Sequence, residues 1–259
     1  MSFDEPDGEK WSESQWGPLL HQLRVWRETR RRSITARVAP GYALVGYAWN
    51  ARGSGYAFRV SRRGWQLMSE RLDQAHVVLM DARQLPTSCP GWYSAEQRVA
   101  LGQGWGRAAY DSLFEEAIAR HPDFEAYYTL KAYHLPPRWY GKPGEWEVFA
   151  TEIASRLPDS LGARIYAHIL LSQAEYYDNI FEDAAVSWPR AKQGFRLLEA
   201  DSPNSVEILS EFAYFACCAG DREEAKRLFK RIGARVELGV WTDDQAFLRA
   251  RAWARMVYG

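Results

Sequence analysis

Apolar residues recur every three or four positions through most of the chain, which is the spacing of amphipathic helices. The pattern is clearest after Ser61, at Trp65, Met68, Leu72, Ala75, Leu79 and Ala82. The same spacing, with breaks at Pro and Gly, predicts helices over residues 16–32, 61–82, 107–120, 124–133, 143–157, 161–177, 191–200, 205–219, 222–232 and 242–253. No segment reads as a β-hairpin, so the sequence predicts an all-α protein.

The region after the first helix is the hardest to interpret. Pro40 and Gly41 are expected to end that helix. An apolar segment over residues 42–49 follows and leads into a glycine-containing loop at 50–55. Aromatic and β-branched residues over 42–58 also allow a short strand. Both interpretations stay open from the sequence.

Capping residues predict several helix starts. Ser61 is expected to cap the helix that follows it. Ser94 with Gln97, and Thr242 with Gln245, have the spacing of a capping box and predict two further starts. Three glycines are expected to interrupt the helix after Ser94: Gly102, Gly104 and Gly106.

One segment near the carboxyl end resembles the tetratricopeptide (TPR) signature, a two-helix hairpin motif. It comprises Leu209, Phe212, Ala213, Ala216, Gly220, Ala225, Phe229 and Ile232. The small residues Ala213 and Ala225 allow two helices to approach closely, and Gly220 supplies the turn. Two other stretches share the second half of the signature: Ala191, Phe195, Leu198 and Pro203, and Phe114, Ala117 and Pro122.

These stretches predict TPR-like stacked helical hairpins, an α-α superhelix, with a less regular N-terminal part. The intervals between them differ from the regular spacing of about 34 residues, and Glu237 stands where a proline is expected. We therefore expect degenerate hairpins. The predicted organisation is a leader, first helix and basic segment over 1–60, packing on a helical domain over 61–259.

A narrower resemblance covers residues 49–253. The strings Trp49-Asn50-Ala51-Arg52-Gly53-Ser54-Gly55-Tyr56, Leu135-Pro136-Pro137-Arg138-Trp139-Tyr140-Gly141 and Ala219-Gly220-Asp221-Arg222 resemble those of the bacterial domain of unknown function numbered 4034. The resemblance implies a TPR-like helical fold in a bacterial protein and no established activity.

Composition indicates the cellular compartment in which the protein is expected to lie. Three cysteines among 259 residues cannot form an even disulfide framework, which favours a reducing cytoplasm. The polar, acidic first ten residues are unlike a secretory signal, so we expect no export. The longest apolar stretches are far below the roughly 18 to 20 residues that span a bilayer. We therefore expect no membrane partner.

The 33 Lys and Arg residues balance the 33 Asp and Glu residues, but the arginines are unevenly distributed along the chain. Residues 21–63 contain ten arginines and one acid, Glu28. Such a block can meet an anionic partner. It can also pair inside the fold with acids elsewhere, among them Glu115, Glu116, Asp123 and Glu125. We favour the second interpretation and do not expect nucleic-acid binding, because dedicated nucleic-acid binders are usually net basic.

Two loops carry the candidate binding residues. Arg138, Trp139 and Tyr140 place a guanidinium among aromatic rings between two helices, an arrangement suited to a carboxylate or phosphate. Arg52 begins a glycine-rich loop, although the lysine and glycine spacing of a P-loop are lacking. The alternative for both is structural, with Trp139 filling a groove and Arg138 binding helix-end carbonyls.

No motif predicts a metal site or a cofactor. The five histidines are scattered, and none lies four residues from another as in a helical metal pair. The leading hypothesis is a protein-interaction module that binds a partner protein on a concave helical face. One alternative is an enzyme with a site built from Arg52, His134, Arg138 and Glu145. Another is a cytosolic immunity or regulatory protein for a toxin or effector.

Overall fold

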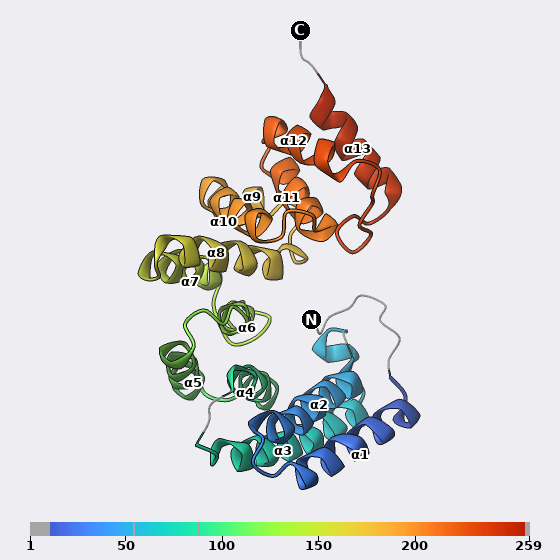
Figure 1. Ribbon diagram of the computed structural model, residues 1–259, viewed down its shortest axis with the longest axis vertical. Helices are drawn as coiled ribbons and strands as arrows, with labels where there is room; N and C mark the ends of the chain where they lie inside the picture. The colour runs from blue at the N-terminus through green and yellow to red at the C-terminus, as the bar shows by residue number, and fades with distance from the viewer. Residues whose placement is uncertain (1–10, 54, 87–88, 257–259) are drawn as a thin grey trace. The chain divides into compact units, whose positions relative to one another are not determined.

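The computed structural model describes residues 11–53, 55–86 and 89–256, which form thirteen α-helices and one 3₁₀ turn (Figure 1). Because no strand occurs in these ranges, the all-α prediction is confirmed. The chain forms two compact units, Met1–Lys131 and Ala132–Gly259. No helix in the described ranges has the length and apolar character needed to cross a bilayer. The predicted division after residue 60 stays a prediction.

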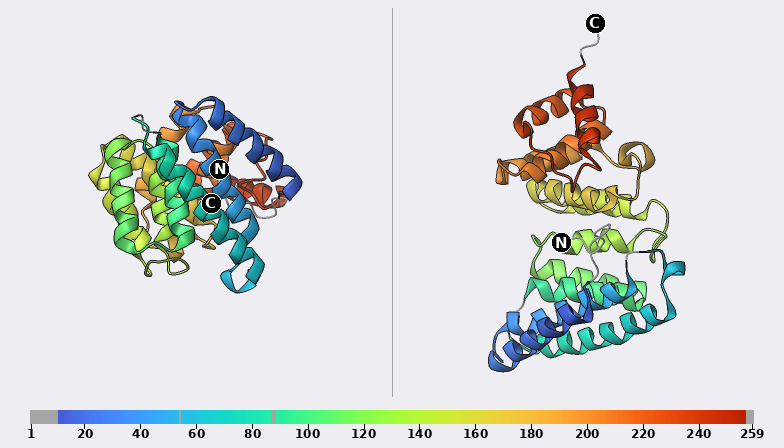
Figure 2. Two further views of the ribbon diagram at one scale, coloured as in Figure 1. Left: turned by 90° about the horizontal axis from the view of Figure 1, so that it is seen from below. Right: turned by 90° about the vertical axis from the view of Figure 1, so that its right-hand side faces the viewer.

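The first unit is built around one long helix pair. Helices α2 and α3 pack along each other, α1 lies on α2, α4 contacts both α2 and α3, and α5 packs on α4 (Figure 2). The helices are α1 (Glu13–Thr29), α2 (Ile34–Arg52), α3 (Arg62–Arg83), α4 (Pro90–Gln103), α5 (Arg107–Arg120) and α6 (Ala126–His134), with a 3₁₀ turn (Ala57–Arg59) between α2 and α3. Helix α6 runs across the boundary between the units.

The second unit is a series of helix pairs. Helix α8 packs between α7 and α10, α11 packs on α10 and α12, and α12 packs on α13. The helices are α7 (Glu145–Arg156), α8 (Asp159–Ala174), α9 (Ile180–Asp183), α10 (Trp188–Asp201), α11 (Val206–Cys218), α12 (Arg222–Ile232) and α13 (Asp244–Arg255). Helix α9 lies between the predicted helices 161–177 and 191–200, where the sequence predicts no helix. These pairs are consistent with helical hairpins, and their TPR-like stacking stays a prediction.

The prediction that Pro40 and Gly41 end the first helix is wrong. Helix α2 begins at Ile34, capped by the Ser33 side chain, and runs through both residues to Arg52. A stripe of α2 is buried: Val38, Gly41, Val45 and Ala48. These residues have the three- and four-residue spacing of a helix face that packs on α3. Burial of this face outweighs the hydrogen bond that proline removes, and no strand forms.

Two predicted caps are also wrong. Helix α4 begins at Pro90, so Ser94 and Gln97 lie buried inside it, and Gln97 Nε2 donates to the Tyr127 carbonyl at 3.3 Å. Proline at the first position of a helix loses no intrahelical bond, which explains this start. The last helix is capped by Asp243, whose carboxylate accepts from the Ala246 amide at 2.6 Å. Ser61 caps α3 as predicted.

The α11–α12 hairpin has the local features expected from the TPR-like signature. Gly220 has a φ of 70°, a left-handed conformation that favours glycine, and it turns the chain between the helices. The Asp221 amide donates to the Ala216 carbonyl at 2.8 Å, and the Asp221 side chain caps α12. Ala213 and Ala225 are fully buried where the two helices pack together.

Candidate functional site

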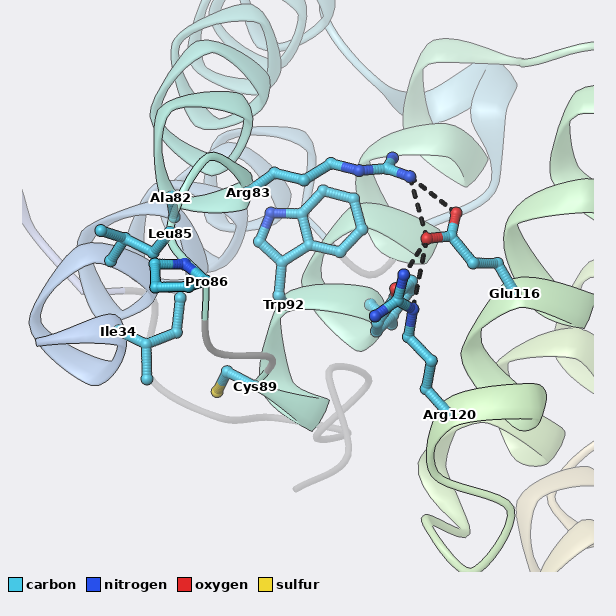
Figure 3. Close-up of a pocket in the computed structure, with 10 residues that line it drawn as sticks. Ile34, Ala82, Arg83, Leu85, Pro86, Cys89, Trp92, Glu116 and Arg120 are labelled. Atoms are coloured by element: carbon cyan, nitrogen blue, oxygen red, sulfur yellow. Dashed lines mark hydrogen bonds and ion pairs between the residues drawn. The ribbon is translucent and has the colours of Figure 1, made fainter.

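A pocket opens in the first unit between the end of α3, the start of α4 and one face of α5 (Figure 3). Its volume is about 190 Å³. The apolar part of its lining comprises Ile34, Ala82, Leu85, Pro86 and Trp92, with the Cys89 thiol nearby. The polar part comprises Arg83, Tyr93, Glu116 and Arg120. We call this the α3–α5 pocket.

The tryptophan of the pocket is fixed by the way α4 begins. Pro90 occupies the first turn, and Trp92 follows two residues later. The indole Nε1 of Trp92 donates to the Leu79 carbonyl of α3 at 2.6 Å, so the ring cannot rotate without losing this buried bond. In Figure 3 the ring stands between the side chains of Leu85 and Pro86 and the charged group around Glu116.

Four polar side chains meet at the other end of the pocket. Arg83 Nη2 lies 2.9 and 2.7 Å from the two carboxylate oxygens of Glu116. The Tyr93 hydroxyl donates to the same carboxylate at 2.8 Å, and Arg120 Nε lies 3.5 Å from it. The Arg83 guanidinium also lies 4.9 Å from the centre of the Trp92 ring.

The charges at this end do not balance. Among the residues that line the pocket, the two guanidiniums of Arg83 and Arg120 share the single carboxylate of Glu116, which leaves an excess of one positive charge in that lining. Burial and the hydrogen bond to Glu116 raise the pKa of Tyr93 to about 12, so this hydroxyl stays a donor at neutral pH. The Arg120 side chain is 55% exposed and is the least constrained member of the group. The pocket therefore presents positive charge beside an apolar wall.

The size and lining of the pocket suit binding better than catalysis. Pockets for cofactors and drug-sized ligands measure roughly 300 to 1,000 Å³, whereas this one holds about one large side chain. Its lining residues include no histidine to activate the Cys89 thiol, and the Glu116 carboxylate already accepts hydrogen bonds from Arg83 and Tyr93.

A second hollow of about 280 Å³ lies at Trp65, Asp73 and Gln103. There the Asp73 carboxylate accepts from Gln103 Nε2 at 2.7 Å.

The predicted candidate Arg52 belongs to the first unit, at the end of α2. Its Nη1 donates to the carbonyls of Gly53 and Gly55 at 2.8 and 3.0 Å. Its guanidinium also lies over the rings of Trp49 and Trp65, at 5.7 and 5.4 Å from their centres. These contacts hold the backbone that follows α2. Arg52 does not line either of the two pockets described above.

The candidates Arg138, Trp139 and Tyr140 lie together in the second unit, on the loop between α6 and α7. Arg138 Nη2 donates to Gln173 Oε1 of α8 at 3.1 Å, and its guanidinium lies 3.4 Å from the centre of the Tyr176 ring. The Trp139 ring lies 5.4 Å from that of Tyr133, and the Tyr140 ring 5.1 Å from that of His134. The loop is thus tied to helices of its own unit.

Backbone contacts show why this loop ends in glycine. A Cβ atom on Gly141 would lie 1.6 Å from the Leu135 carbonyl oxygen, so no other residue fits without moving the backbone. The Tyr140 amide donates to the His134 carbonyl at 3.2 Å, which closes the loop on itself. These contacts support the structural interpretation of the motif, and a binding role for Arg52, Arg138, Trp139 and Tyr140 stays a prediction.

The residues of the alternative enzyme site divide between the units. His134, Arg138 and Glu145 belong to the second unit and Arg52 to the first. His134 is fully buried, and the Glu145 carboxylate accepts from the Lys142 amide at 2.9 Å. Their convergence on one substrate stays a prediction.

The α3–α5 pocket was not found from the sequence. We expected Glu116 to pair with the arginines of residues 21–63, but it contacts Arg83 and Arg120, which lie outside that block. Arg37, inside the block, pairs with Asp81 at 2.5 Å. The one sequence signal for the pocket is the short connector between two strong helices that ends at Pro90.

A buried ionisable pair joins α3 and α4 away from the pocket lining. The Glu96 carboxyl is 1% exposed and lies 2.5 Å from His76 Nδ1, while its other oxygen has no hydrogen-bond partner among the described residues. Burial raises the pKa of Glu96, and the charge and hydrogen bond of His76 oppose that shift. The His76 ring also meets the Trp105 ring edge-on at 5.6 Å.

Within the described ranges, no three His, Cys, Asp or Glu side chains come close enough together to hold a metal ion. Comparison with known proteins adds no further assignment. No family model matches the chain, and neither a curated protein nor a solved structure matches it. The case for function therefore depends on the geometry of this chain.

Proposed function

We propose that the protein is an interaction module that binds a segment of a partner protein through the α3–α5 pocket. The segment inserts one large apolar side chain beside Trp92 and places a carboxylate against Arg120. The observation that carries the proposal is the juxtaposition of an apolar wall with two guanidiniums that share one carboxylate. A TPR-like stack, the resemblance to domain 4034, a cytoplasmic location and a toxin- or effector-regulating role are compatible with this proposal.

The apolar part of the pocket is suited to hold the large apolar side chain that the partner inserts. Binding hot spots are small, desolvated pockets that include tryptophan, tyrosine or arginine, and a single inserted side chain supplies much of the affinity. Trp92 is held rigidly by its bond to Leu79, so little conformational entropy is lost when a side chain packs on it. The volume of about 190 Å³ suits one leucine, methionine or aromatic side chain.

The charged end of the pocket is suited to bind an acidic residue of the partner next to that inserted side chain. Arg120 contacts Glu116 through Nε at 3.5 Å, and because its side chain is 55% exposed, its guanidinium can also bind an incoming carboxylate. Helix α4 also begins at the pocket without a side-chain cap, and the positive end of its dipole adds to the attraction. A basic segment would meet the excess positive charge and bind less well.

A random 12-residue peptide library displayed on phage tests this function. We expect selection on the wild-type protein to enrich an apolar residue next to Asp or Glu. The enriched peptide should lose about tenfold or more in affinity, ~1.4 kcal/mol, with Cys89→Trp, which fills the pocket, and with Arg120→Ala. Arg249→Ala is the matched control, because Arg249 is an exposed arginine on α13. Thermal melting confirms that each variant folds.

The proposal is wrong if the selected peptides bind Cys89→Trp as tightly as the wild type, or if selection enriches basic peptides that Arg120→Ala still binds.

A further inference from the structure

Two aromatic rings are stacked on each other in the solvent at the start of α3. Tyr56 precedes the 3₁₀ turn, Phe58 lies within it, and the two residues are 71% and 80% exposed. Their ring centres are 5.8 Å apart, and the ring planes differ by 10°. No other large apolar side chains in the described ranges are as exposed as these two. Large exposed apolar groups that pack only on each other are typical of surfaces that a partner covers.

Three arginines follow these rings closely in the sequence. The Arg59 guanidinium lies 5.7 Å from the centre of the Phe58 ring, and Arg62 and Arg63 are exposed in the first turn of α3. Within the described ranges none of the three forms an ion pair with a carboxylate. We call these three arginines with Tyr56 and Phe58 the aromatic–arginine surface.

The position of two of these arginines is locally unfavourable. The start of a helix carries partial positive charge and prefers acidic residues, yet the first turn of α3 has Arg62 and Arg63 and no acid. The sequence supplies no nearby compensation either, because no Asp or Glu occurs between Glu28 and Glu70. Residues that disfavour the local helix and form no compensating contact in the fold indicate a functional position.

We propose that the aromatic–arginine surface binds an acidic segment of a protein partner, independently of the α3–α5 pocket. Carboxylates of the segment replace the missing counter-charges at Arg59, Arg62 and Arg63. Apolar side chains of the segment cover Tyr56 and Phe58. The surface uses none of the residues that line the pocket, so the two proposals stand on separate observations.

The charge of the chain favours a protein segment over a nucleic acid. The chain carries no net charge, whereas binding along a phosphate backbone uses an extended basic surface. A short surface of three arginines with two aromatic rings matches the composition of protein-binding hot spots.

Three defined probes test the assignment on the full-length chain. The first is a 16-residue peptide of Glu and Asp with two leucines, the second is a 16-nucleotide oligouridylate, and the third is vesicles containing phosphatidylserine. Binding is measured by fluorescence anisotropy or co-sedimentation for the wild type, Tyr56→Ser/Phe58→Ser and Arg59→Gln/Arg62→Gln/Arg63→Gln. Leu248→Ser and Arg249→Gln are controls, since they remove an exposed apolar side chain and an exposed arginine from α13.

We expect the acidic peptide to bind the wild type and both controls. Each surface variant should lose about tenfold in affinity. Cys89→Trp, which fills the α3–α5 pocket, should bind this peptide as the wild type does. Added salt should weaken binding, because exposed charges are screened. The five side chains of the aromatic–arginine surface are exposed, so the two surface variants are expected to fold, and circular dichroism checks the folding of every variant.

The inference is overturned if the acidic peptide binds Tyr56→Ser/Phe58→Ser as tightly as the wild type, or does not bind at all. It is also overturned if the oligouridylate or the vesicles bind more tightly than the peptide and lose that binding in both surface variants. Failure here leaves the α3–α5 pocket proposal untouched, because that proposal depends on Cys89→Trp and Arg120→Ala.

Discussion

Replacing His76 by leucine should leave a buried carboxyl without its hydrogen-bond partner. Glu96 is 1% exposed, and His76 Nδ1, 2.5 Å away, is its one partner among the described residues. Removing one member of a buried ion pair costs about 3 to 5 kcal/mol. Because the His76 side chain is 35% exposed, water relieves part of that cost. We therefore expect a loss of about 2 to 3 kcal/mol at pH 8.

The loss should depend on pH in a defined direction. Burial already holds the pKa of Glu96 above its ordinary value of 4.5, and loss of His76 raises this pKa further. When folding raises the pKa of a carboxyl, its ionisation opposes folding at every pH above the pKa that it has in the unfolded state. At lower pH the carboxyl is protonated in both states and has no such effect. The destabilisation by His76→Leu should therefore be larger at pH 8 than at pH 4.5.

Urea unfolding followed by circular dichroism measures both effects. Val77→Ala is the control, because Val77 is the next residue of α3 and is 68% exposed, and we expect no change there. Adding Glu96→Gln to His76→Leu should restore part of the stability at pH 8, since the amide is neutral. The reasoning is refuted if His76→Leu matches Val77→Ala, or if its cost is the same at both pH values.

Three further substitutions, and a fourth that serves as a control, test other parts of the structure. Gly141→Ala should cost about 3 kcal/mol or more, because its Cβ would lie 1.6 Å from the Leu135 carbonyl oxygen. Gly106→Ala, with open space around it, should be nearly neutral in the same urea titration. Burial raises the pKa of Glu224, but hydrogen bonds from Arg196, Lys192 and Arg227 outweigh it and lower the pKa to about 2. Melting temperature should therefore fall as the pH drops from 4.5 towards 2, and fall less in Glu224→Gln. Burial, aided by the charge of Glu207, raises the pKa of Glu211 to about 7. Glu211→Gln should therefore stabilise the protein by about 1 to 2 kcal/mol at pH 8 and have little effect at pH 4. Equal melting temperatures at pH 8 would contradict this.

Helical periodicity predicted most of the fold because core-facing residues repeat regularly. Arg107–Arg120 and Arg222–Ile232 begin and end where the sequence predicts. Helical periodicity did not predict α2, because Pro40 and Gly41 are common helix breakers, yet both are buried inside this helix and Gly41 packs against α3. It also failed at the start of α4, which begins at Pro90 without a side-chain cap, and at α13, where Asp243 next to Thr242 is the capping residue.

The candidate site was harder to predict than the fold. The side chains of the α3–α5 pocket come from four helices, α2 to α5, and from the connector between α3 and α4, and only the tertiary packing brings Arg83 to Glu116. Conversely, Arg138 beside Trp139 and Tyr140 has the composition of a binding loop, but its contacts tie α6 to α8 within the second unit. Composition alone does not distinguish a ring that packs on its own chain from one that packs on a partner.

The binding role of the α3–α5 pocket is tested most directly by nuclear magnetic resonance. A peptide enriched by selection on the wild type is titrated into ¹⁵N-labelled protein, and the indole signals of Trp92 and Trp253 are followed. We predict that the Trp92 signal shifts with the peptide concentration, that the Trp253 signal does not, and that Arg120→Ala weakens the response. A Trp92 signal that stays fixed while the peptide binds would contradict the account.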